Sequence, residues 1–256
     1  MQIDKILTFT ISSEFGFFKK PDVNDPIFFT FNIIPKPTLL GILGAILGFG
    51  GYSQQKGKYP DFYEKLKDLL IGIRPLKNKG VFAKTLIKYN NTVGYANQDG
   101  VLNIIEQTLI NPKYEIFVGL DEDNKLHKRF FEYFQKDNIR SEYIPYMGKN
   151  EFHLNIENVE YVKAKRFDYN DDFQIYTIFP NIKNKPIQMT HDDGLFSKNS
   201  EINIFYFFEN LPVGFDELNQ YVYKEFVFSN AYFNKECEYF KSLNLFDING
   251  KIVCLF

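Results

Sequence analysis

Apolar and polar residues alternate near the start of the chain, in residues 5–12 (KILTFTIS). Leu7, Phe9 and Ile11 fall on one face of an extended segment, and threonine or serine occupies the other. A period of two predicts a half-buried β-strand. Further segments predicted as strands are IFFTFNII (27–34), GVFAKTLIKYNN (80–91), KYEIFVGL (113–120) and NIENVEYVKAKRF (155–167).

The stretch PKPTLLGILGAILGFGGY (35–52) has a helical period instead. Thr38 is the predicted N-cap, since the preceding prolines keep the chain extended. Leucine and isoleucine form two stripes at helical spacing, and glycine forms a third. This glycine stripe consists of Gly41, Gly44 and Gly48. Each glycine costs a helix about 1 kcal/mol relative to alanine, so we expect the stripe to lie closely against a sheet and the helix to end at Gly50 and Gly51.

Two more segments have a helical pattern, YPDFYEKLKDLLIGI (59–73) and DEDNKLHKRFFEYFQKDN (121–138). The order of elements is then β, α, an extended hairpin-like region, β, α, β, which is the ferredoxin-like split βαβ arrangement. After residue 168, short β-prone runs alternate with Asn, Asp, Gly and Pro. We therefore predict an α+β protein with a ferredoxin-like domain in residues 1–168 and a smaller antiparallel β-domain in residues 169–256.

Composition narrows the class of protein. The chain has 256 residues, of which 45% are hydrophobic, enough for one large domain or two small ones. Cys237 and Cys254 are too few to staple such a fold, which favours a reducing cytoplasm. The N-terminal alternation does not resemble a signal peptide. The longest apolar run, residues 39–51, has 13 residues, whereas a spanning helix needs about 20, so we expect no membrane segment.

Charge is distributed unevenly along the chain. The net charge is −2, but residues 1–90 hold 13 Lys/Arg against 7 Asp/Glu (+6), and residues 91–256 hold 17 against 25 (−8). Residues 69–98 contain no acid at all. The cations of this acid-free window are Arg74, Lys77, Lys79, Lys84 and Lys88. A polyanionic partner would produce this asymmetry, and so would chance segregation of surface charge.

The glycines of residues 41–51 match neither the P-loop nor the dinucleotide-binding pattern. The start of the helix, rather than its glycines, offers groups that can bind a ligand. Lys36 and Thr38 stand there with free backbone N–H groups and no acid in the first turn, a combination that can bind phosphate. An ordinary core helix with an exposed lysine fits the same residues.

The histidines do not form a recognisable catalytic or metal site. His191 precedes two aspartates, a pattern more typical of a polar turn than of a metal site, and His127 is expected at the surface. A metal-independent ribonuclease needs only an acid, a base and a cation near a ribose 2′-hydroxyl. Candidates for those roles are Lys125, His127 and Tyr133, or His153 with Tyr146, but no spacing selects them. We predict no catalytic residue, no metal and no cofactor.

Basic and aromatic residues are interleaved in two segments. Lys84 and Lys88 share one strand face with Leu86, and Tyr89 follows. In EYVKAKRFDY (160–169), Arg166 follows two lysines that share a face. Phosphates attract cations and unstacked bases stack on flat side chains, so the pattern fits single-stranded RNA. An exposed sheet face rich in lysine and tyrosine fits it too.

Three blocks, taken in order, resemble the CRISPR-associated Cas-five family of the RAMP superfamily. The first, FFKKP followed by PKPTLLGILGAILG, is similar to its F-[RK]-[RK]-P and P-x-P-T-x-x-G-x-L-G-A-I-x-G signature. YIPYMGKNEF resembles its P-x-Y-L-G-K segment, and FENLPVGF with YKEFVFSNA resembles its C-terminal L-P-x block. The matches lie in residues 15–48, 143–152 and 208–231, and they are closest to the type I-B branch.

The resemblance implies an RRM-related ferredoxin-like domain with a thumb hairpin at about residues 74–112. It implies a non-catalytic subunit of a Cascade surveillance complex in antiviral defence, one that binds the 5′ handle of the CRISPR RNA and caps the backbone. The implied neighbours are a Cas-seven-type backbone subunit and the Cas-eight-type large subunit, and contact with target DNA is left open. The RNA-binding residues expected from these motifs and from the basic segments are Lys19, Lys20, Lys36, Thr38, Arg74, Lys79, Lys84, Lys88, Tyr89, Gly148, Lys149 and Arg166.

One branch of the family, in type I-C systems, cleaves the precursor RNA with a tyrosine and an adjacent Lys-His pair. This chain has no Lys-His dipeptide: Lys125 and His127 are separated by a leucine, and the order at 127–128 is reversed. The alternative function, a metal-independent endoribonuclease acting on the CRISPR repeat, is therefore ranked second.

Overall fold

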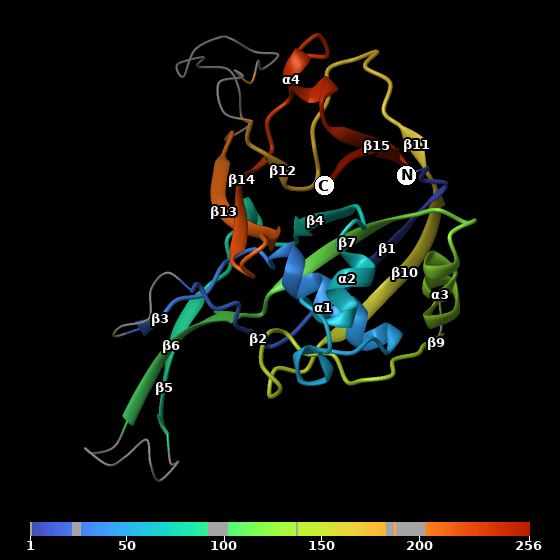
Figure 1. Cartoon of the computed structure of the whole chain (residues 1–256). Coiled ribbons are helices and arrows are strands. Elements are labelled where there is room, and N and C mark those ends of the chain that lie inside the picture. The colour runs from blue at the N-terminus through green and yellow to red at the C-terminus, as the bar shows by residue number, and fades with distance from the viewer. Residues whose placement is uncertain (1, 22–26, 92–101, 137, 183–186, 188–202) are drawn as a thin grey trace.

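The structure is a computed structural model, and it describes residues 2–21, 27–91, 102–136, 138–182, 187 and 203–256. A four-stranded antiparallel sheet forms its centre, in the order β10-β1-β7-β4 (Figure 1). Its strands are β1 (Lys5–Ser12), β4 (Ile71–Pro75), β7 (Lys113–Leu120) and β10 (Asn155–Lys163). Thr8 lies opposite Phe117 of β7 and Glu160 of β10. The predicted α+β class is confirmed, and β1 and β7 have the predicted bounds.

Helix α1 (Lys36–Leu47) begins and ends differently from the prediction. Its N-cap is Pro35 and not Thr38, which lies inside the first turn. It ends at Gly48, which has φ +74° in the left-handed region that glycine adopts without strain. The backbone N–H groups of residues 142 and 143 donate to the carbonyls of Ile46 and Ala45, which satisfies the last turn.

Gly41 and Gly44 of the glycine stripe pack against a second helix and not against a sheet, whereas Gly48 lies against Glu142. Helix α2 (Asp61–Leu66) crosses α1 at Phe62. A Cβ atom on Gly44 would lie 2.4 Å from the Cβ of Phe62, whereas one on Gly41 would lie 3.7 Å from the same ring. Only Gly44 is therefore required by the close approach. The predicted helix over residues 59–73 is much shorter, because the chain leaves the helix at residues 67–70 and residues 71–73 enter the central sheet as part of β4.

Helix α3 (Lys125–Tyr133) follows the acidic loop that precedes it. Asn124 caps it by accepting a hydrogen bond from the N–H of Leu126 at 2.9 Å. Buried Phe130 packs at 5.9 Å from the ring of Phe134, just beyond the helix end. Short elements elsewhere are the 3₁₀ turns η1 (Tyr52–Gln54) and η2 (Asn78–Gly80), the strands β8 (Phe134–Gln135) and β9 (Asn138–Ile139), and α4 (Glu238–Lys241).

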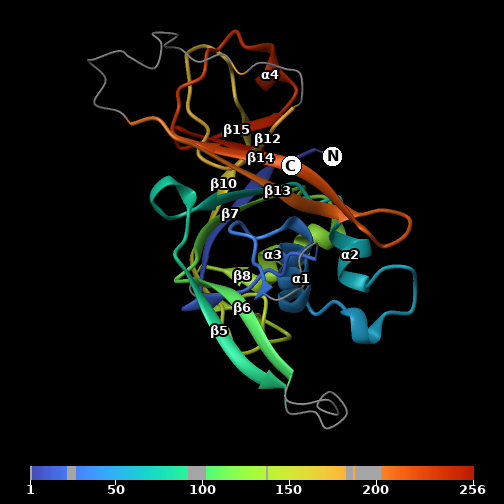
Figure 2. The ribbon, with the colours of Figure 1, turned by 90° about the vertical axis from the view of Figure 1, so that its left-hand side faces the viewer.

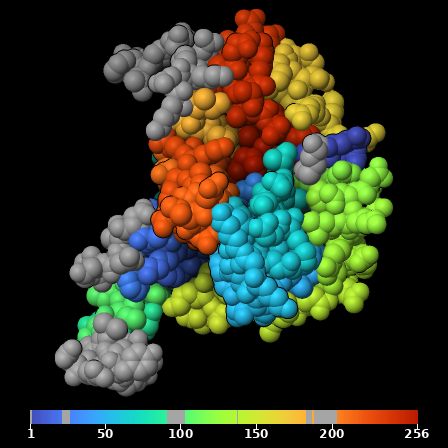
Figure 3. Space-filling model, viewed as in Figure 1, coloured from blue at the N-terminus to red at the C-terminus, as the bar shows by residue number. Residues whose placement is uncertain are grey.

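A two-stranded arm projects from this body (Figures 1 and 3). It consists of β5 (Lys84–Asn91) paired antiparallel with β6 (Leu102–Ile110). At its root β6 also pairs with β2 (Phe15–Gly16) and β3 (Ile27–Phe28), so β6 is central and β5 is an edge strand. The predicted strand over 27–34 is confined to its first two residues.

The C-terminal part adds two three-stranded antiparallel sheets, β12-β14-β13 and β11-β15-β16. Their strands are β11 (Lys165–Arg166), β12 (Phe179–Pro180), β13 (Tyr206–Phe215), β14 (Tyr221–Ser229), β15 (Asn244–Ile248) and β16 (Lys251–Leu255). One buried cluster around Phe233 and Phe240 belongs to this part alone. The inner face of the β13–β14 hairpin instead joins the main core through Leu211 and Phe226. The hairpin therefore lies directly over α1 and the root of the arm.

Candidate nucleic-acid interface

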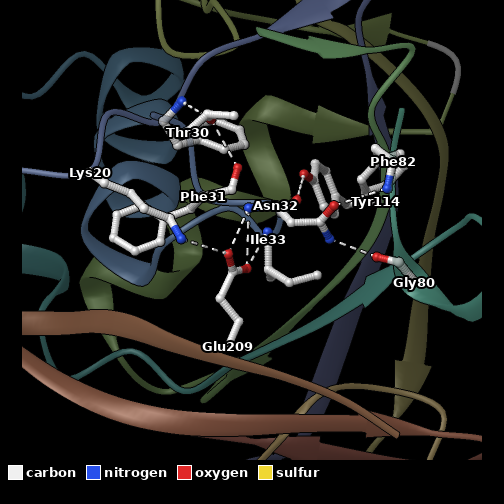
Figure 4. Close-up of polar contacts among 10 residues, drawn as sticks. Lys20, Thr30, Phe31, Asn32, Ile33, Gly80, Phe82, Tyr114 and Glu209 are labelled. Carbon is white, nitrogen blue, oxygen red and sulfur yellow. Dashed lines mark hydrogen bonds and ion pairs between the residues drawn. The ribbon is translucent and has the colours of Figure 1, made fainter. Parts of the chain in front are cut away.

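Buried Asn32 holds the root of the arm in place (Figure 4). Its Nδ2 donates to the carbonyl of Gly80 at 2.7 Å, and its Oδ1 accepts from the N–H of Phe82 at 2.9 Å. The hydroxyl of fully buried Tyr114 donates to the Asn32 carbonyl at 2.5 Å. Every polar group of this side chain is satisfied, which makes the network a rigid link between residues 30–34, η2 and the start of β5.

Glu209 of β13 closes the network from the hairpin side (Figure 4). Its carboxylate accepts hydrogen bonds from the N–H groups of Asn32 at 2.9 Å and Ile33 at 2.8 Å, and Lys20 Nζ lies 3.6 Å away. Burial raises the pKa of Glu209, while these N–H groups and the nearby lysines oppose that shift. Lys20, a predicted RNA ligand, is thus partly neutralised by an acid that lies 189 positions further along the chain.

A cavity of about 280 Å³ opens beside the start of α1. It is called the Lys149 pocket below. Four of the predicted RNA-binding residues meet here from separate segments: Lys19, Thr38, Gly148 and Lys149. Its other lining residues are Phe17, Phe18, Phe31, Pro35, Glu106, Pro212 and Tyr221. The wall combines aromatic rings with a few polar groups, as ligand-binding pockets commonly do.

Lys149 is fully paired inside this pocket. Its Nζ lies 2.8 Å from Glu106 Oε2 and 2.9 Å from Glu151 Oε1, and 4.9 Å from the centroid of the Tyr89 ring. The Tyr89 hydroxyl donates to the other oxygen of Glu106 at 2.8 Å. Burial acts to lower the pKa of Lys149, but the hydrogen bonds to Glu106 and Glu151 outweigh burial and raise it. This lysine is charged and oriented, yet its charge is already balanced by two carboxylates.

Gly148 allows the loop that carries Lys149 to pack directly against the backbone of Phe17. Its φ is +89°, and a Cβ atom there would lie 1.9 Å from the carbonyl oxygen of Phe17. The N–H of Phe17 in turn donates to the carbonyl of Met147 at 3.1 Å. The two segments with family-like motifs, 15–20 and 143–152, are therefore held together through backbone contact that only glycine permits.

Lys36 does not face the Lys149 pocket or solvent. It is 8% exposed, and its Nζ donates to the main-chain oxygen of Phe256 at 3.0 Å. Burial lowers the pKa of Lys36 from 10.5 to about 8, with Asp68 opposing and Lys224 assisting the shift. The expectation of an exposed lysine at the helix start is wrong, because the last residue of the chain packs against this turn. Thr38 alone of the helix-start candidates lines the pocket.

The lysines of β5 are exposed and unpaired. Lys84 and Lys88 share one strand face with Leu86, which is 57% exposed, and neither lysine has a carboxylate oxygen within 4.0 Å among the described residues. Partial burial lowers the pKa of Lys84. The charge of Glu209 opposes this shift, and the charge of Lys20 adds to it. Tyr89 lies on the opposite face with Glu106. The arm therefore has a cationic face and a separate face that leads to the Lys149 pocket.

The three remaining candidates lie elsewhere. Arg74 of β4 forms an ion pair with Glu115 at 3.0 Å and stacks on the ring of Tyr176. Lys79 lies in the turn η2, and Arg166 of β11 lies over the ring of Phe246 in the C-terminal sheet. The twelve predicted residues thus do not form one surface. Asn32 and Glu209 were missed; the side-chain amide inside the otherwise mostly apolar run IFFTFNII was the available signal for Asn32.

The histidines are placed differently from one another. His127 is buried and not at the surface, and its Nδ1 accepts from the N–H of Asp121 at 2.9 Å. Burial lowers the pKa of His127, with Asp121 opposing. His153 is exposed and pairs with Tyr146 across an isolated antiparallel bridge. His191 lies outside the described residues. Within the described ranges, no group of three or more His, Cys, Asp or Glu is arranged to hold a metal.

In the part of the chain that the structure covers, no helix combines the length and the apolar character needed to cross a membrane.

Comparison with known proteins identifies the fold. No family model and no curated protein sequence matches the chain. A chain of a CRISPR RNA-guided surveillance complex superimposes with a TM-score of 0.50 at 10% identity, covering 88% of this chain and 90% of that one. A CRISPR protein from Archaeoglobus fulgidus covers 98% of both chains at 14% identity and a TM-score of 0.49. This chain shares its fold with a component of a CRISPR surveillance complex.

Proposed function

We propose that this protein is a non-catalytic, RNA-binding subunit of a type I CRISPR surveillance complex, and that it binds the 5′ handle of the CRISPR RNA. Two unpaired lysines, Lys84 and Lys88, on the exposed face of a projecting arm are the observation that carries the proposal. The fold shared with a chain of a CRISPR RNA-guided surveillance complex supports it. So does the sheet order β10-β1-β7-β4, which we interpret as a ferredoxin-like core.

The arm suits a phosphate backbone better than the Lys149 pocket does. Lys84 and Lys88 are four residues apart on a strand, roughly 13 Å, so each contacts a different phosphate. Lys149 has two carboxylates of its own and attracts an anion weakly. Its pocket instead offers aromatic rings and the Thr38 hydroxyl, which suit a base or a sugar. We assign phosphates to the arm and a nucleoside to the pocket.

Salt-dependent binding of a handle RNA tests this assignment. The variant K84A/K88A loses two phosphate contacts, so the slope of log Kd against log salt should fall by about 1.4 for a single strand, at about 0.7 per phosphate. The control is K125A/K128A, which removes two exposed lysines of α3. Fluorescence anisotropy with labelled RNA at four salt concentrations gives the slope. A slope equal to that of the control contradicts the assignment.

The alternative, a metal-independent endoribonuclease, is favoured by one observation. Tyr146 and His153 lie opposite each other at the base of the loop that holds Lys149. A tyrosine, a histidine and a lysine are sufficient groups for attack by a ribose 2′-hydroxyl. Repeat RNA incubated with the protein in EDTA separates the two functions. A single cut that H153A abolishes supports the nuclease, whereas binding without cleavage supports the RNA-binding subunit.

A further inference from the structure

A second cavity, of about 430 Å³, lies between the turn after β4 and the C-terminal part. It is called the Lys77 pocket below. One wall is the segment from Arg74 to Lys79, and the other includes Gln174, Tyr176 and Asn230. The connection between β4 and β5 projects on the opposite side of the molecule from α1 and α2 (Figure 2). This pocket and the Lys149 pocket share no lining residue.

The Lys77 pocket carries excess positive charge. None of its lining residues is acidic, and three are cations. Arg74 is balanced by Glu115 at 3.0 Å, but Lys77 and Lys79 have no carboxylate oxygen within 4.0 Å in the described ranges. The side-chain amide of Gln174 has no hydrogen-bond partner among those residues either. Two cations and one side-chain amide, none of them paired among the described residues, therefore line one cavity.

The cations are held in place by the backbone of η2. Lys79 has φ +56°, which a lysine adopts rarely and at some cost in strain. The N–H of Gly80 donates to the Lys77 carbonyl at 2.9 Å, and the Gly80 carbonyl accepts from Asn32. Gly80 itself packs so closely that a Cβ atom would lie 2.5 Å from the Phe228 ring. The turn that presents the two lysines is thus fixed from the core.

We infer that the Lys77 pocket is a second anion site, which binds a phosphate group of a nucleic-acid backbone. A phosphate accepts hydrogen bonds on several oxygens at once, and this cavity offers ammonium, guanidinium and amide donors from two walls. The acid-free window also runs without interruption from Lys77 to Lys88, so one polyanion meets no carboxylate of this segment along it. The site extends the proposed function and is chemically independent of the lysines on β5.

The test uses a variant that preserves the turn. Lys77→Ala combined with Lys79→Gly removes both cations, and glycine accepts the positive φ at position 79. Oligouridylate of twenty nucleotides is the probe, because phosphate contacts carry no sequence preference. We expect binding to weaken about fivefold at 0.1 M salt and the salt slope to fall by about 0.7, the value for one phosphate, relative to K125A/K128A. Circular dichroism verifies that each variant is folded.

The outcomes separate this site from the β5 lysines. If only K77A/K79G weakens binding, the second site stands and the arm assignment fails. If only K84A/K88A does, the second site is overturned. If neither variant matters, or the protein does not bind the probe, both fail. Oligoglutamate is the competing probe: tighter binding of it than of oligouridylate, lost in K77A/K79G, would assign the pocket to an acidic protein partner and overturn the inference.

Discussion

Replacing two glycines of α1 by alanine should have opposite effects on stability. Gly41 and Gly44 lie on the same stripe, three residues apart, and both meet Phe62. At Gly41 the added Cβ makes ordinary contact at 3.7 Å with the ring. At Gly44 it would lie 2.4 Å from the Phe62 Cβ, a separation that forces α2 to move. Comparing the two variants isolates the effect of packing on stability, because both replace glycine by alanine in the same helix.

The magnitudes follow from two contributions. Alanine stabilises a helix interior by about 1 kcal/mol over glycine, and overpacking a core costs about 1–3 kcal/mol. Gly41→Ala should therefore raise the free energy of unfolding by about 1 kcal/mol. Gly44→Ala should lower it by about 1 kcal/mol, since the clash involves atoms next to the backbone of α2. The two variants should differ by about 2 kcal/mol.

Urea unfolding followed by far-ultraviolet circular dichroism measures the difference, since the chain has no tryptophan to follow by fluorescence. Gly57→Ala is the control, because nothing lies within 4 Å of a Cβ atom at that loop position. It reports the effect of the substitution on the unfolded chain. Equal midpoints for Gly41→Ala and Gly44→Ala would refute the view that Gly44 alone is needed for the contact between α1 and α2.

Three further changes test two buried polar side chains and one close backbone contact. Because the pKa of Lys36 is about 8 in the fold and 10.5 unfolded, the unfolded chain binds more protons between these values. The free energy of unfolding should therefore rise by about 2 kcal/mol from pH 7 to 9.5 relative to Lys36→Met, as measured by urea unfolding at both pH values. Asn32→Ala leaves a buried N–H and a buried carbonyl unpaired and should cost about 3 kcal/mol, with faster amide hydrogen exchange in η2 and β5. Gly148→Ala should cost about 3 kcal/mol in thermal unfolding, because its Cβ would meet the carbonyl of Phe17.

The sequence pattern was sufficient to predict the two strands that lie in the middle of the central sheet. Period-two alternation located β1, and a short apolar run located β7, because both strands are central in the sheet. The same reasoning failed over residues 59–73. The last three residues of that segment continue its apolar pattern, but pairing with β7 satisfies their backbone groups and buries Ile71 and Ile73 in the sheet. Tertiary pairing overrides local period there, and a single sequence does not encode which segment will be adjacent.

The candidate site could be predicted only in part, because charge pairing is a long-range property. Lys149 and Lys84 look equivalent in sequence, because no acid stands directly beside either lysine. In the fold, Lys149 is paired with Glu106 and Glu151, whereas Lys84 has no carboxylate within ion-pair distance among the described residues. Glu106 lies 43 positions from Lys149 in the sequence, so no local motif predicts the ion pair between them. Lys36 was misplaced for the same reason, since its partner is Phe256.

The acid-free window nevertheless predicts where charge stays available. A lysine inside it has no neighbouring acid in the sequence, so only a carboxylate brought by the fold can neutralise it. The fold brings Glu115 to Arg74 but brings none within 4.0 Å of Lys77, Lys79, Lys84 or Lys88 among the described residues. Charges further than about 10 Å away are largely screened at 0.1 M salt. Glu209 partly offsets the charge of Lys84, but none of these four lysines forms an ion pair among the described residues, so a chain with a net charge of −2 retains exposed, unneutralised lysines.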